Sequence, residues 1–382
     1  MTAIHEATAE ELEDWDAHTV DVPGGHVFQS RTWGEYRARH GWRPRYLVFD
    51  DGFRVLSAER RWPIVGGAGG YIARGPVPAG EPPANTADRL RAVADWLADR
   101  GVDVVSSDAE VPVDTGYPEL LRARGFHQIE EVQPSRHRMS LELGADQEAV
   151  WSGFTKSLRQ TIRTAEHRGL RLVRYDAAKD PDPEVAALFE RPDVAELGLD
   201  GLRPVFERLH DELARTARRR GFPIAPRAQL IDSSSHAVLA GLAMHIEVRS
   251  SEDEYVGSLL FFRHGRRITY SLSADAVAFR KQFPGTVQLV LWRAIQVAVA
   301  EGLPEFDLAG VDIAGARRKP APGEEMYGLF EMKERFGARW IDLAGNHEWV
   351  ARPWRYAAGR VALRLNRLGL IPSRGPAGRS GP

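Results

Sequence analysis

The chain contains 382 residues, of which 43% are hydrophobic and 27% are charged; this composition is typical of a globular protein and excludes a disordered or fibrous one. Its 51 Lys and Arg residues nearly balance its 53 Asp and Glu residues, so contact with nucleic acid or an anionic membrane would require a local patch. The sequence has no cysteine, signal-like leader or 18-residue apolar run, which excludes disulfides and thiolate catalysis and indicates a cytoplasmic protein.

In the first part of the chain, helix and strand patterns alternate irregularly, which predicts mixed α/β structure. Ser30 is a good N-cap for one helix, and Gly41 would end that helix. A later strand leads directly to Asp108. The predicted helices are 9–18, 30–40, 86–99 and 117–124, and the predicted strands are 45–50, 53–62, 70–74, 102–107, 126–131 and 136–142.

The later part of the chain begins with two helical patterns and continues into strands that we interpret as a meander. The predicted helices are 146–154, 156–168, 204–219, 286–300, 327–336 and 354–367, and the predicted strands are 170–175, 226–232, 236–247, 254–262, 267–273, 305–310 and 339–344. Residues 311–326 lack periodicity and are predicted to form a mobile loop, and the tail after Pro372 is expected to fray.

Two regions of this map share one pattern: a meander of strands, a helix of about fifteen residues, a glycine and a short apolar strand that carries an aspartate. The segments DRGVDVVSSD and AEGLPEFDLAG show the end of the pattern. The pattern predicts a duplicated α/β fold with an active cleft between the copies. The expected domains are 1–145, completed by 341–370, and 146–340, with a flexible tail at 371–382.

Most catalytic signatures are absent: there is no GxSxG, GxxxxGK[ST], GxGxxG after a strand, or HExxH. The 12 histidines are scattered without ligand spacing, so no metal site is expected. The polar run Ser233–His236 is interpreted as a turn between two strands, and the glycines between Gly66 and Gly70 as a hairpin turn.

One segment has a phosphate-binding pattern. Gln282, Gly285 and Val287 partly match the Q/R-x-x-G-x-G/A loop with which GNAT-type acetyltransferases hold the pyrophosphate of acetyl-CoA at a helix N-terminus. The branched side chain of Val287 crowds the position where the backbone must approach the ligand closely. The segment is therefore either a CoA site or an ordinary start of a helix.

A series of segments, taken in order from about residue 26 to residue 350, resembles the Fem family of peptidoglycan-bridge aminoacyltransferases. The resemblance implies two GNAT-like domains with mixed, mainly antiparallel sheets flanked by helices. It also implies transfer of an amino acid from aminoacyl-tRNA to an amine of a peptidoglycan precursor stem peptide, with no cofactor besides that co-substrate. The segments are HVFQSRTWGEYRARHGWRPRYLV, GGYIARGPVP, WSGFTKSLRQTIRTAEHRGLRL, ITYSLSA, VLWRAIQVAVAEGLPEFDLAGV and GLFEMKERFGARWIDLAGN.

Some relatives carry a coiled-coil arm, but no sustained heptad pattern appears between 200 and 330, so none is expected here.

Four residues match positions at which the family contacts its acceptor. Arg37 matches a cation that contacts the precursor's nucleotide or lipid-linked pyrophosphate, with a solvated helix arginine as the structural alternative. Arg203 resembles a second phosphate-contacting arginine, and Phe206 lies near a position that is often tyrosine in relatives. Tyr270 matches a substrate-facing tyrosine, with a buried strand tyrosine as the alternative.

Lys333 and Asp108 are the candidate catalytic residues. Lys333 matches the F-K-x-x-F element of the family, although Met332 replaces the usual aromatic residue, and an ammonium there can offset phosphate charge or a tetrahedral oxyanion. Asp108 occupies a position at which relatives carry an acidic residue beside the acceptor, where it would position the attacking amine or accept its proton. Both side chains are expected to face one groove between the domains. Asp307 is expected instead to hold the turn after its strand.

Two regions of the sequence are rich in basic residues. Lys156, Arg159 and Arg163 share one face of a predicted helix, and seven arginines but no acidic residue follow Glu348. Such patches bind tRNA phosphates or an anionic lipid surface, or are merely solvated, and the alternatives stay open. The implied partners are aminoacyl-tRNA and a UDP-linked or lipid-linked muropeptide, with peripheral contact at the inner face of the cell membrane as an alternative location, and the expected state is a monomer.

Three other functions remain compatible with the sequence. The same duplicated fold would serve a CoA-dependent N-acyltransferase, and the acceptor would be an amine-bearing secondary metabolite in a related tRNA-dependent reaction. A non-catalytic alternative is a peripheral scaffold in cell-wall assembly. The sequence does not identify the amino acid that is transferred.

Overall fold

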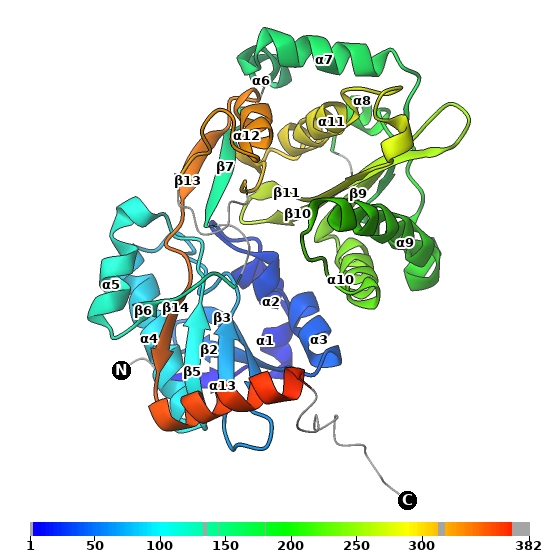
Figure 1. Ribbon diagram of the computed structural model, residues 1–382. Coiled ribbons are helices and arrows are strands. Elements are labelled where there is room, and N and C mark those ends of the chain that lie inside the picture. Colours follow the sequence, from blue (N-terminus) through cyan, green and yellow to red (C-terminus); the bar gives the residue numbers. More distant parts are fainter. Residues whose placement is uncertain (1–2, 133–135, 145, 180, 312–317, 369–382) are drawn as a thin grey trace, which may run out of the picture. The chain divides into compact units, whose positions relative to one another are not determined.

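The structure, a computed structural model, describes residues 3–132, 136–144, 146–179, 181–311 and 318–368 (Figure 1). It divides into two compact units, unit 1 (Met1–Arg136 and Asp342–Pro382) and unit 2 (His137–Ile341). Each unit contains a seven-stranded mixed sheet flanked by helices. The fold class predicted from the sequence, duplicated GNAT-like α/β units, is therefore confirmed.

The sheet of unit 1 has the strand order β1-β2-β3-β4-β5-β14-β6. Its neighbouring strands are antiparallel except for β4 and β5, which are parallel. The strand β14 comes from the late part of the chain and lies between β5 and β6. The strands are β1 (Ile4–Glu6), β2 (Arg43–Phe49), β3 (Arg54–Arg61), β4 (Ala68–Ile72), β5 (Val102–Ser107), β6 (His127–Gln128) and β14 (His347–Val350).

Helices cover the sheet of unit 1 through two apolar clusters. The helix α4 buries Leu90, Val93 and Leu97, the face expected from its sequence spacing, in the core that contains Val105 of β5. The helix α3 begins as expected after Ser30, whose hydroxyl accepts a hydrogen bond from the backbone N–H of Trp33 at 3.0 Å. The helices are α1 (Ala9–Glu13), α2 (Trp15–Thr19), α3 (Arg31–Arg39), α4 (Pro83–Asp99), α5 (Tyr117–Ala123) and α13 (Pro353–Arg367).

The sheet of unit 2 repeats this arrangement in the order β8-β9-β10-β11-β12-β7-β13. Its first four strands form an antiparallel meander, and β12 then pairs in parallel with β11. The helix α11 and Gly302 precede β12 as α4 and Gly101 precede β5, which confirms the repeat seen in the sequence. The strands are β7 (His137–Glu142), β8 (Arg171–Tyr175), β9 (Ala243–Arg249), β10 (Tyr255–His264), β11 (Arg267–Asp275), β12 (Glu305–Asp307) and β13 (Arg339–Asp342).

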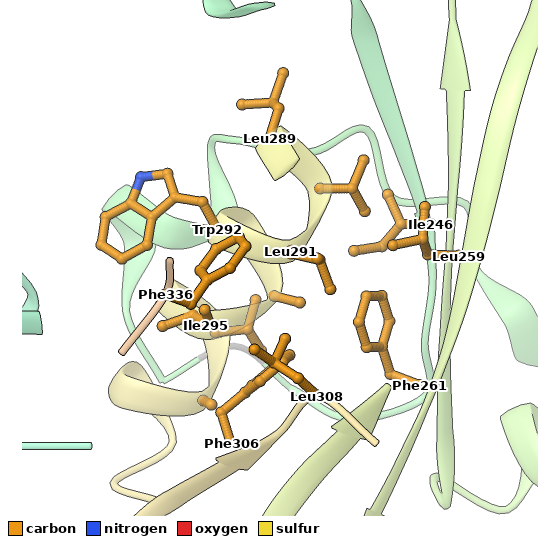
Figure 2. Close-up of a cluster of buried hydrophobic side chains, with 14 of the residues drawn as sticks. Ile246, Leu259, Phe261, Leu289, Leu291, Trp292, Ile295, Phe306, Leu308 and Phe336 are labelled. Carbon is orange, nitrogen blue, oxygen red and sulfur yellow. The ribbon is translucent and has the colours of Figure 1, made fainter. Parts of the chain in front are cut away.

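The core of unit 2 forms around α11. Figure 2 shows Leu291 and Ile295 of this helix pointing toward Ile246 of β9 and Phe261 of β10, with Phe306 of β12 alongside. All five are buried, so α11 is held against the middle of the sheet by apolar contact. The helices are α6 (Gln147–Gly153), α7 (Lys156–Glu166), α8 (Pro183–Ala186), α9 (Val194–Arg220), α10 (Arg227–Leu239), α11 (Thr286–Ala300) and α12 (Tyr327–Glu334).

The sequence interpretation fails over residues 226–239, where two strands were expected and the structure has the helix α10. Pro226 starts this helix, and Leu230, Ser234 and Val238 are buried at a spacing of four residues. The serine run is therefore part of a helix and not a turn. Small serines at buried helical positions gave the segment a polar appearance that concealed its helical period.

The other differences are smaller. The helix predicted at 204–219 starts earlier, at Val194, and contains a break at Gly198, whose φ is 56°. The strand predicted at 305–310 ends at Asp307. The predicted loop at 311–326 lies partly, and the predicted tail at 371–382 lies entirely, outside the described residues.

Candidate functional site

A polar cluster lies at the end of the equivalent strand in each unit, after β5 in unit 1 and after β12 in unit 2. The cluster in unit 2 contains the predicted residues Lys333 and Tyr270. The cluster in unit 1 contains the predicted residue Asp108. The expectation that Lys333 and Asp108 face one shared groove stays a prediction, because each is described within its own unit.

The two parallel strands of unit 2 separate beside the first cluster. Within the described residues, β12 pairs with β11 only from Arg267 to Thr269, whereas β11 continues to Asp275 alongside β10. The register between β10 and β11 shifts at Ser271, because Leu272 and Tyr270 face consecutive residues of β10. Among the residues that the structure describes, the backbone of β11 beyond Thr269 therefore has no strand partner on the side of β12.

Lys333 lies in the last turn of α12 and is only 2% exposed. Its ammonium Nζ donates hydrogen bonds to the carbonyl oxygens of Gly310 at 2.6 Å and Ala309 at 3.2 Å. The same nitrogen lies 5.7 Å from the centroid of the Tyr270 ring. Two of the three N–H donors are thus used by the turn after β12, and the described residues supply no acceptor for the third.

Burial lowers the pKa of Lys333 to about 8, and the charge of Asp307 opposes this shift only in part. An ammonium with this pKa is mostly protonated at neutral pH but gives up its proton far more readily than an exposed lysine. Such a group can donate a hydrogen bond to a developing oxyanion or a proton to a leaving oxygen. The local chemistry fits acyl transfer.

Asp307 and Tyr270 lie near the Lys333 ammonium. The Asp307 carboxylate accepts a hydrogen bond from the backbone N–H of Ala309 at 2.8 Å, which fixes the turn that Lys333 contacts. Ala309 has a φ of 59°, a left-handed conformation that is costly for a residue with a side chain. The expected role of Asp307 in holding the turn is confirmed. The Tyr270 hydroxyl donates to Ser273, and burial raises the pKa of this tyrosine.

Asp108 lies immediately after β5 and is 1% exposed. Its carboxylate accepts hydrogen bonds from the Tyr71 hydroxyl at 2.9 Å and from the backbone N–H of Arg74 at 2.6 Å. The guanidinium Nε of Arg74 lies 3.7 Å from Asp108 and 3.8 Å from Glu110. Burial raises the pKa of Asp108, although the charge of Arg74 opposes the shift. This brings its proton affinity nearer to that of an amine.

Sequence reasoning missed Tyr71, Arg74, Glu110 and His26, whose imidazole lies 3.8 Å from Glu110. Tyr71 and Arg74 both belong to the segment GGYIARGPVP, which carries part of the Fem resemblance. That segment was the available signal. What it did not reveal is that parallel pairing of β4 with β5 brings these residues to Asp108.

Arg37 lies on α3 against aromatic rings. Its guanidinium carbon is 3.8 Å from the ring centroid of Trp42 and 5.5 Å from that of Trp33. Burial lowers the pKa of Arg37, and the nearby charge of Arg60 acts in the same direction. The side chain is thus held in place before any ligand binds, and its predicted phosphate contact remains a prediction.

The predicted acceptor residues on α9 have contrasting environments. Arg203 is exposed, and its nearest carboxylate in the described part of unit 2 is that of Asp200 at 3.9 Å. Phe206 is completely buried, with its ring centroid 5.0 Å from that of His245. Arg203 is therefore accessible to a ligand, whereas Phe206 contributes to the core of unit 2.

The predicted basic patch lies on α7. Lys156 and Arg163 are exposed, and the guanidinium carbon of Arg163 lies 5.6 Å from the centroid of the Trp151 ring. Arg159 is directed differently, because it donates to the carbonyl oxygens of Ser152 and Phe154 at the end of α6. Arg159 thus has a structural role in capping α6, and the contact of this patch with tRNA or a membrane is untested.

The start of α11, the candidate CoA loop, packs against α7. Gly285 has a φ of 87°, and a Cβ added there would lie 2.8 Å from Cγ2 and 3.0 Å from the carbonyl oxygen of Thr161. The glycine is therefore explained by its conformation and by the close approach of α7. Arg168 also donates to the carbonyl oxygen of Gln282 at 3.2 Å.

Two further properties concern the described residues as a whole. No helix among them is sufficiently long and apolar to span a membrane. No group of three or more His, Asp or Glu side chains in the described ranges is arranged to hold a metal ion.

The comparisons with known proteins agree with this geometry. Residues 152–327, within unit 2, match the family described as acetyltransferase (GNAT) domain. The fold and this match together show a chain of two GNAT-like units, of which unit 2 carries the family match. No curated protein matches the chain significantly.

Among solved structures, the chain is similar to FemX, with a TM-score of 0.71, 18% identity, and coverage of 93% of this chain and 99% of FemX. The fold is that of FemX, in keeping with the resemblance to the Fem family. The chain is also similar to L-PGS from Bacillus licheniformis, with a TM-score of 0.49, 13% identity, and coverage of 95% of this chain and 97% of that one. A tandem GNAT protein from the clavulanic acid biosynthesis pathway gives a TM-score of 0.46 and 12% identity, with coverage of 92% and 99%.

Proposed function

We propose that the protein is an aminoacyltransferase that moves an amino acid from aminoacyl-tRNA to an amine of a peptidoglycan precursor stem peptide. The observation that carries this proposal is the buried Lys333 ammonium beside the separated strands β11 and β12. The Fem resemblance of the sequence and the FemX fold support the choice of donor and acceptor.

The reaction requires positioning and charge stabilisation rather than a cofactor. The acceptor nitrogen forms a bond to the carbonyl carbon of the aminoacyl ester, the bond from that carbon to the ribose oxygen breaks, and the oxygen leaves with a proton. The remaining N–H of Lys333 would donate to the tetrahedral oxyanion, and its pKa of about 8 suits proton donation to the leaving oxygen.

Asp108 would act on the acceptor. A carboxylate is a weak base for an ammonium, but the raised pKa of buried Asp108 narrows the difference. Its two oxygens already accept hydrogen bonds from Tyr71 and Arg74, which orient the carboxylate. Its role would therefore be to hold and orient the acceptor amine, with proton transfer as a secondary contribution.

The alternative donor is acetyl-CoA. In a CoA-binding GNAT domain the backbone at the start of the helix equivalent to α11 must admit a pyrophosphate. Here the Gly285 position contacts Thr161 of α7, and Val287 adds a branched side chain. These contacts favour aminoacyl-tRNA over CoA.

We propose that the protein acts in the cytoplasm on a nucleotide-linked or a lipid-linked precursor. The alternatives are aminoacylation of a secondary metabolite and a non-catalytic scaffold role. The test is incubation of the protein with a mixture of charged tRNAs and a pentapeptide precursor, followed by mass spectrometry of the product. The mass increase would identify the amino acid.

A product that forms with the wild-type protein and disappears after treatment of the tRNA with ribonuclease would support the proposal. Calorimetric titration with acetyl-CoA is the matched experiment. Saturable binding of acetyl-CoA together with no tRNA-dependent product would replace the proposal with CoA-dependent acylation.

A further inference from the structure

A basic cavity of ≈ 840 Å³ lies in unit 1, beside Trp42, the residue on whose ring the Arg37 guanidinium lies. It forms where the starts of β2, β4 and β5 and the end of β3 meet the inner side of α13. Asp108, by contrast, follows the opposite end of β5. The cavity is lined by His40–Arg43, Arg45, Glu59–Pro63, Val65–Ala68, Arg100–Val102, Arg355, Leu363 and Asn366.

The charge of this lining is one-sided. Six of the lining residues are arginines and one, Glu59, is a carboxylate that pairs with Arg45 at 2.9 Å. Among the described residues, Arg43, Arg60 and Arg61 form no ion pair, and all three are exposed. Several unneutralised guanidinium groups around one cavity favour a ligand that carries phosphate.

The floor of the cavity is rigid. The indole N–H of Trp62 donates to the buried carboxylate of Asp103 at 2.8 Å, and Arg355 of α13 lies 3.3 Å from the same carboxylate. The ring of Trp62 is also enclosed by glycines, since a Cβ at Gly359 would lie 2.4 Å from it. A cavity with a fixed floor loses little conformational freedom when a ligand binds.

Exposed apolar side chains lie on the two elements beside this cavity. Trp354 is 89% exposed and Val361 55%, and their spacing of seven residues places them on one outer face of α13. Leu368, 71% exposed, follows the helix as its C-cap. Ile64, 60% exposed, lies at the tip of the turn between β3 and β4, which contacts α13 through Arg355.

Ile64 is exposed and also has an unfavourable backbone conformation. Its φ is 54°, a left-handed value that is unfavourable for a β-branched residue. Neither its conformation nor its burial explains an isoleucine here. Apolar side chains that project beside a cluster of arginines are typical of proteins that insert shallowly into an anionic lipid surface.

We propose that α13 and the β3–β4 turn of unit 1 bind an anionic bilayer, with Ile64, Trp354, Val361 and Leu368 entering the interface and the exposed arginines beside them contacting lipid phosphates. The helix α13 suits this role because it contains no acidic residue from Pro353 to Arg367. This inference deepens the proposed function, since a lipid-linked precursor would be met at such a surface.

Two other occupants fit the observations less well. RNA would use the arginines but has no need of a projecting aliphatic stripe on α13. A second copy of the chain would use the stripe, but Arg360 and Arg364 lie exposed beside it and would be brought close to their own equivalents in a symmetric pair.

The test is flotation of the full chain with phosphatidylcholine vesicles, with and without phosphatidylglycerol. We expect binding only to the anionic vesicles, and weaker binding as salt is raised. Arg60→Ala and Arg61→Ala should each lower the partition coefficient about fivefold, the equivalent of about 1 kcal/mol for a basic residue near such a surface. Trp354→Ala should lower it about tenfold, because less apolar area enters the interface.

Matched controls separate this surface from general effects. Val277→Ser removes a half-exposed apolar side chain from unit 2, and Arg122→Ala removes an exposed arginine from α5; neither should alter partitioning. Ile64→Asn tests the turn without strain, because asparagine tolerates the left-handed conformation. It should weaken vesicle binding while the unfolding temperature is maintained or rises, because the backbone strain at this position is relieved.

Four outcomes would overturn the inference. They are equal binding to neutral vesicles, loss of binding in the controls as large as in the variants, saturable binding of inorganic phosphate without vesicle binding, and loss of tRNA binding rather than vesicle binding in Arg60→Ala. Conversion of a dimer to a monomer by Trp354→Ala would assign the stripe to self-association. The vesicle assay requires no transfer reaction, so its failure leaves the proposed function standing, and failure of the transfer assay leaves lipid binding testable.

Discussion

Unit 1 and unit 2 share a strand order but differ at their central parallel pair. In unit 1, β4 stays paired with β5 as far as Ile72 and Ser107, whereas in unit 2 the pairing of β11 with β12 stops at Thr269 and Asp307. In unit 1 the paired strands lead to the Asp108 carboxylate, which accepts hydrogen bonds from Tyr71 and Arg74. In unit 2 the separated strands lie beside the Lys333 ammonium, for whose third N–H the described residues supply no acceptor. One fold therefore offers two kinds of site, and we expect chemistry in unit 2 and acceptor positioning in unit 1.

The sharpest test of this division is Lys333→Met in unit 2. Methionine fills the buried volume but removes the donor, so we expect kcat to fall by about one to three powers of ten. The measurement is steady-state transfer with charged tRNA and the precursor, with circular dichroism to establish folding. Unchanged kinetics in a folded variant would show that Lys333 takes no part in the reaction, and that the separated strands β11 and β12 do not mark the reaction site.

The pH dependence of stability in the same variant tests whether the Lys333 ammonium is buried. Because burial lowers the pKa of Lys333 from 10.5 to about 8, the unfolded chain binds more protons than the folded chain between these values. The free energy of unfolding of the wild type should therefore rise relative to Lys333→Met as pH increases from about 8 to about 10.5, by about 3 kcal/mol in total. Urea denaturation across this range measures the difference. A constant difference would mean that the lysine is not desolvated.

A third test compares a helix glycine in each unit. A Cβ at Gly359 of α13 would lie 2.4 Å from the Trp62 ring, whereas one at Gly328 of α12 meets nothing within 4 Å. We expect Gly359→Ala to destabilise the protein by about 1–3 kcal/mol and Gly328→Ala to stabilise it by about 0.5–1 kcal/mol. Chemical denaturation monitored by tryptophan fluorescence gives both values. Equal effects would show that α13 is not packed closely on Trp62.

The smallest effect is expected for Asp108→Asn in unit 1. Asparagine keeps an oxygen for the Arg74 N–H but loses the charge, so kcat/KM should fall by about tenfold, mainly through KM. The exposed Asp114→Asn is the control. A fall in kcat as large as that of Lys333→Met would assign chemistry to both units.

The sequence sufficed for features that depend on local spacing. The Ser30 cap, the apolar face of α4 and the aspartate that ends the helix–glycine–strand pattern in each unit were all predicted, because a few neighbouring residues determine them. The helix α10 was missed because buried serines disrupted its apolar period.

The site in unit 1 required information of another kind. Tyr71 and Arg74 reach Asp108 across more than thirty residues, and only the parallel register of β4 with β5 brings them there. No local pattern encodes that register, because it depends on how α4, the helix that connects the two strands, packs on the sheet. The basic cavity is similar, since its arginines come from separate turns and from α13.

The position of β14 has a consequence for how the chain is made. This strand, His347–Val350, fills the gap between β5 and β6, although both of those strands leave the ribosome more than two hundred residues earlier. The N-terminal segment of unit 1 therefore lacks the strand that joins β5 to β6 until nearly the whole polypeptide has emerged. Completion of unit 1 is thus a late event in biogenesis, after all strands of unit 2 have been translated.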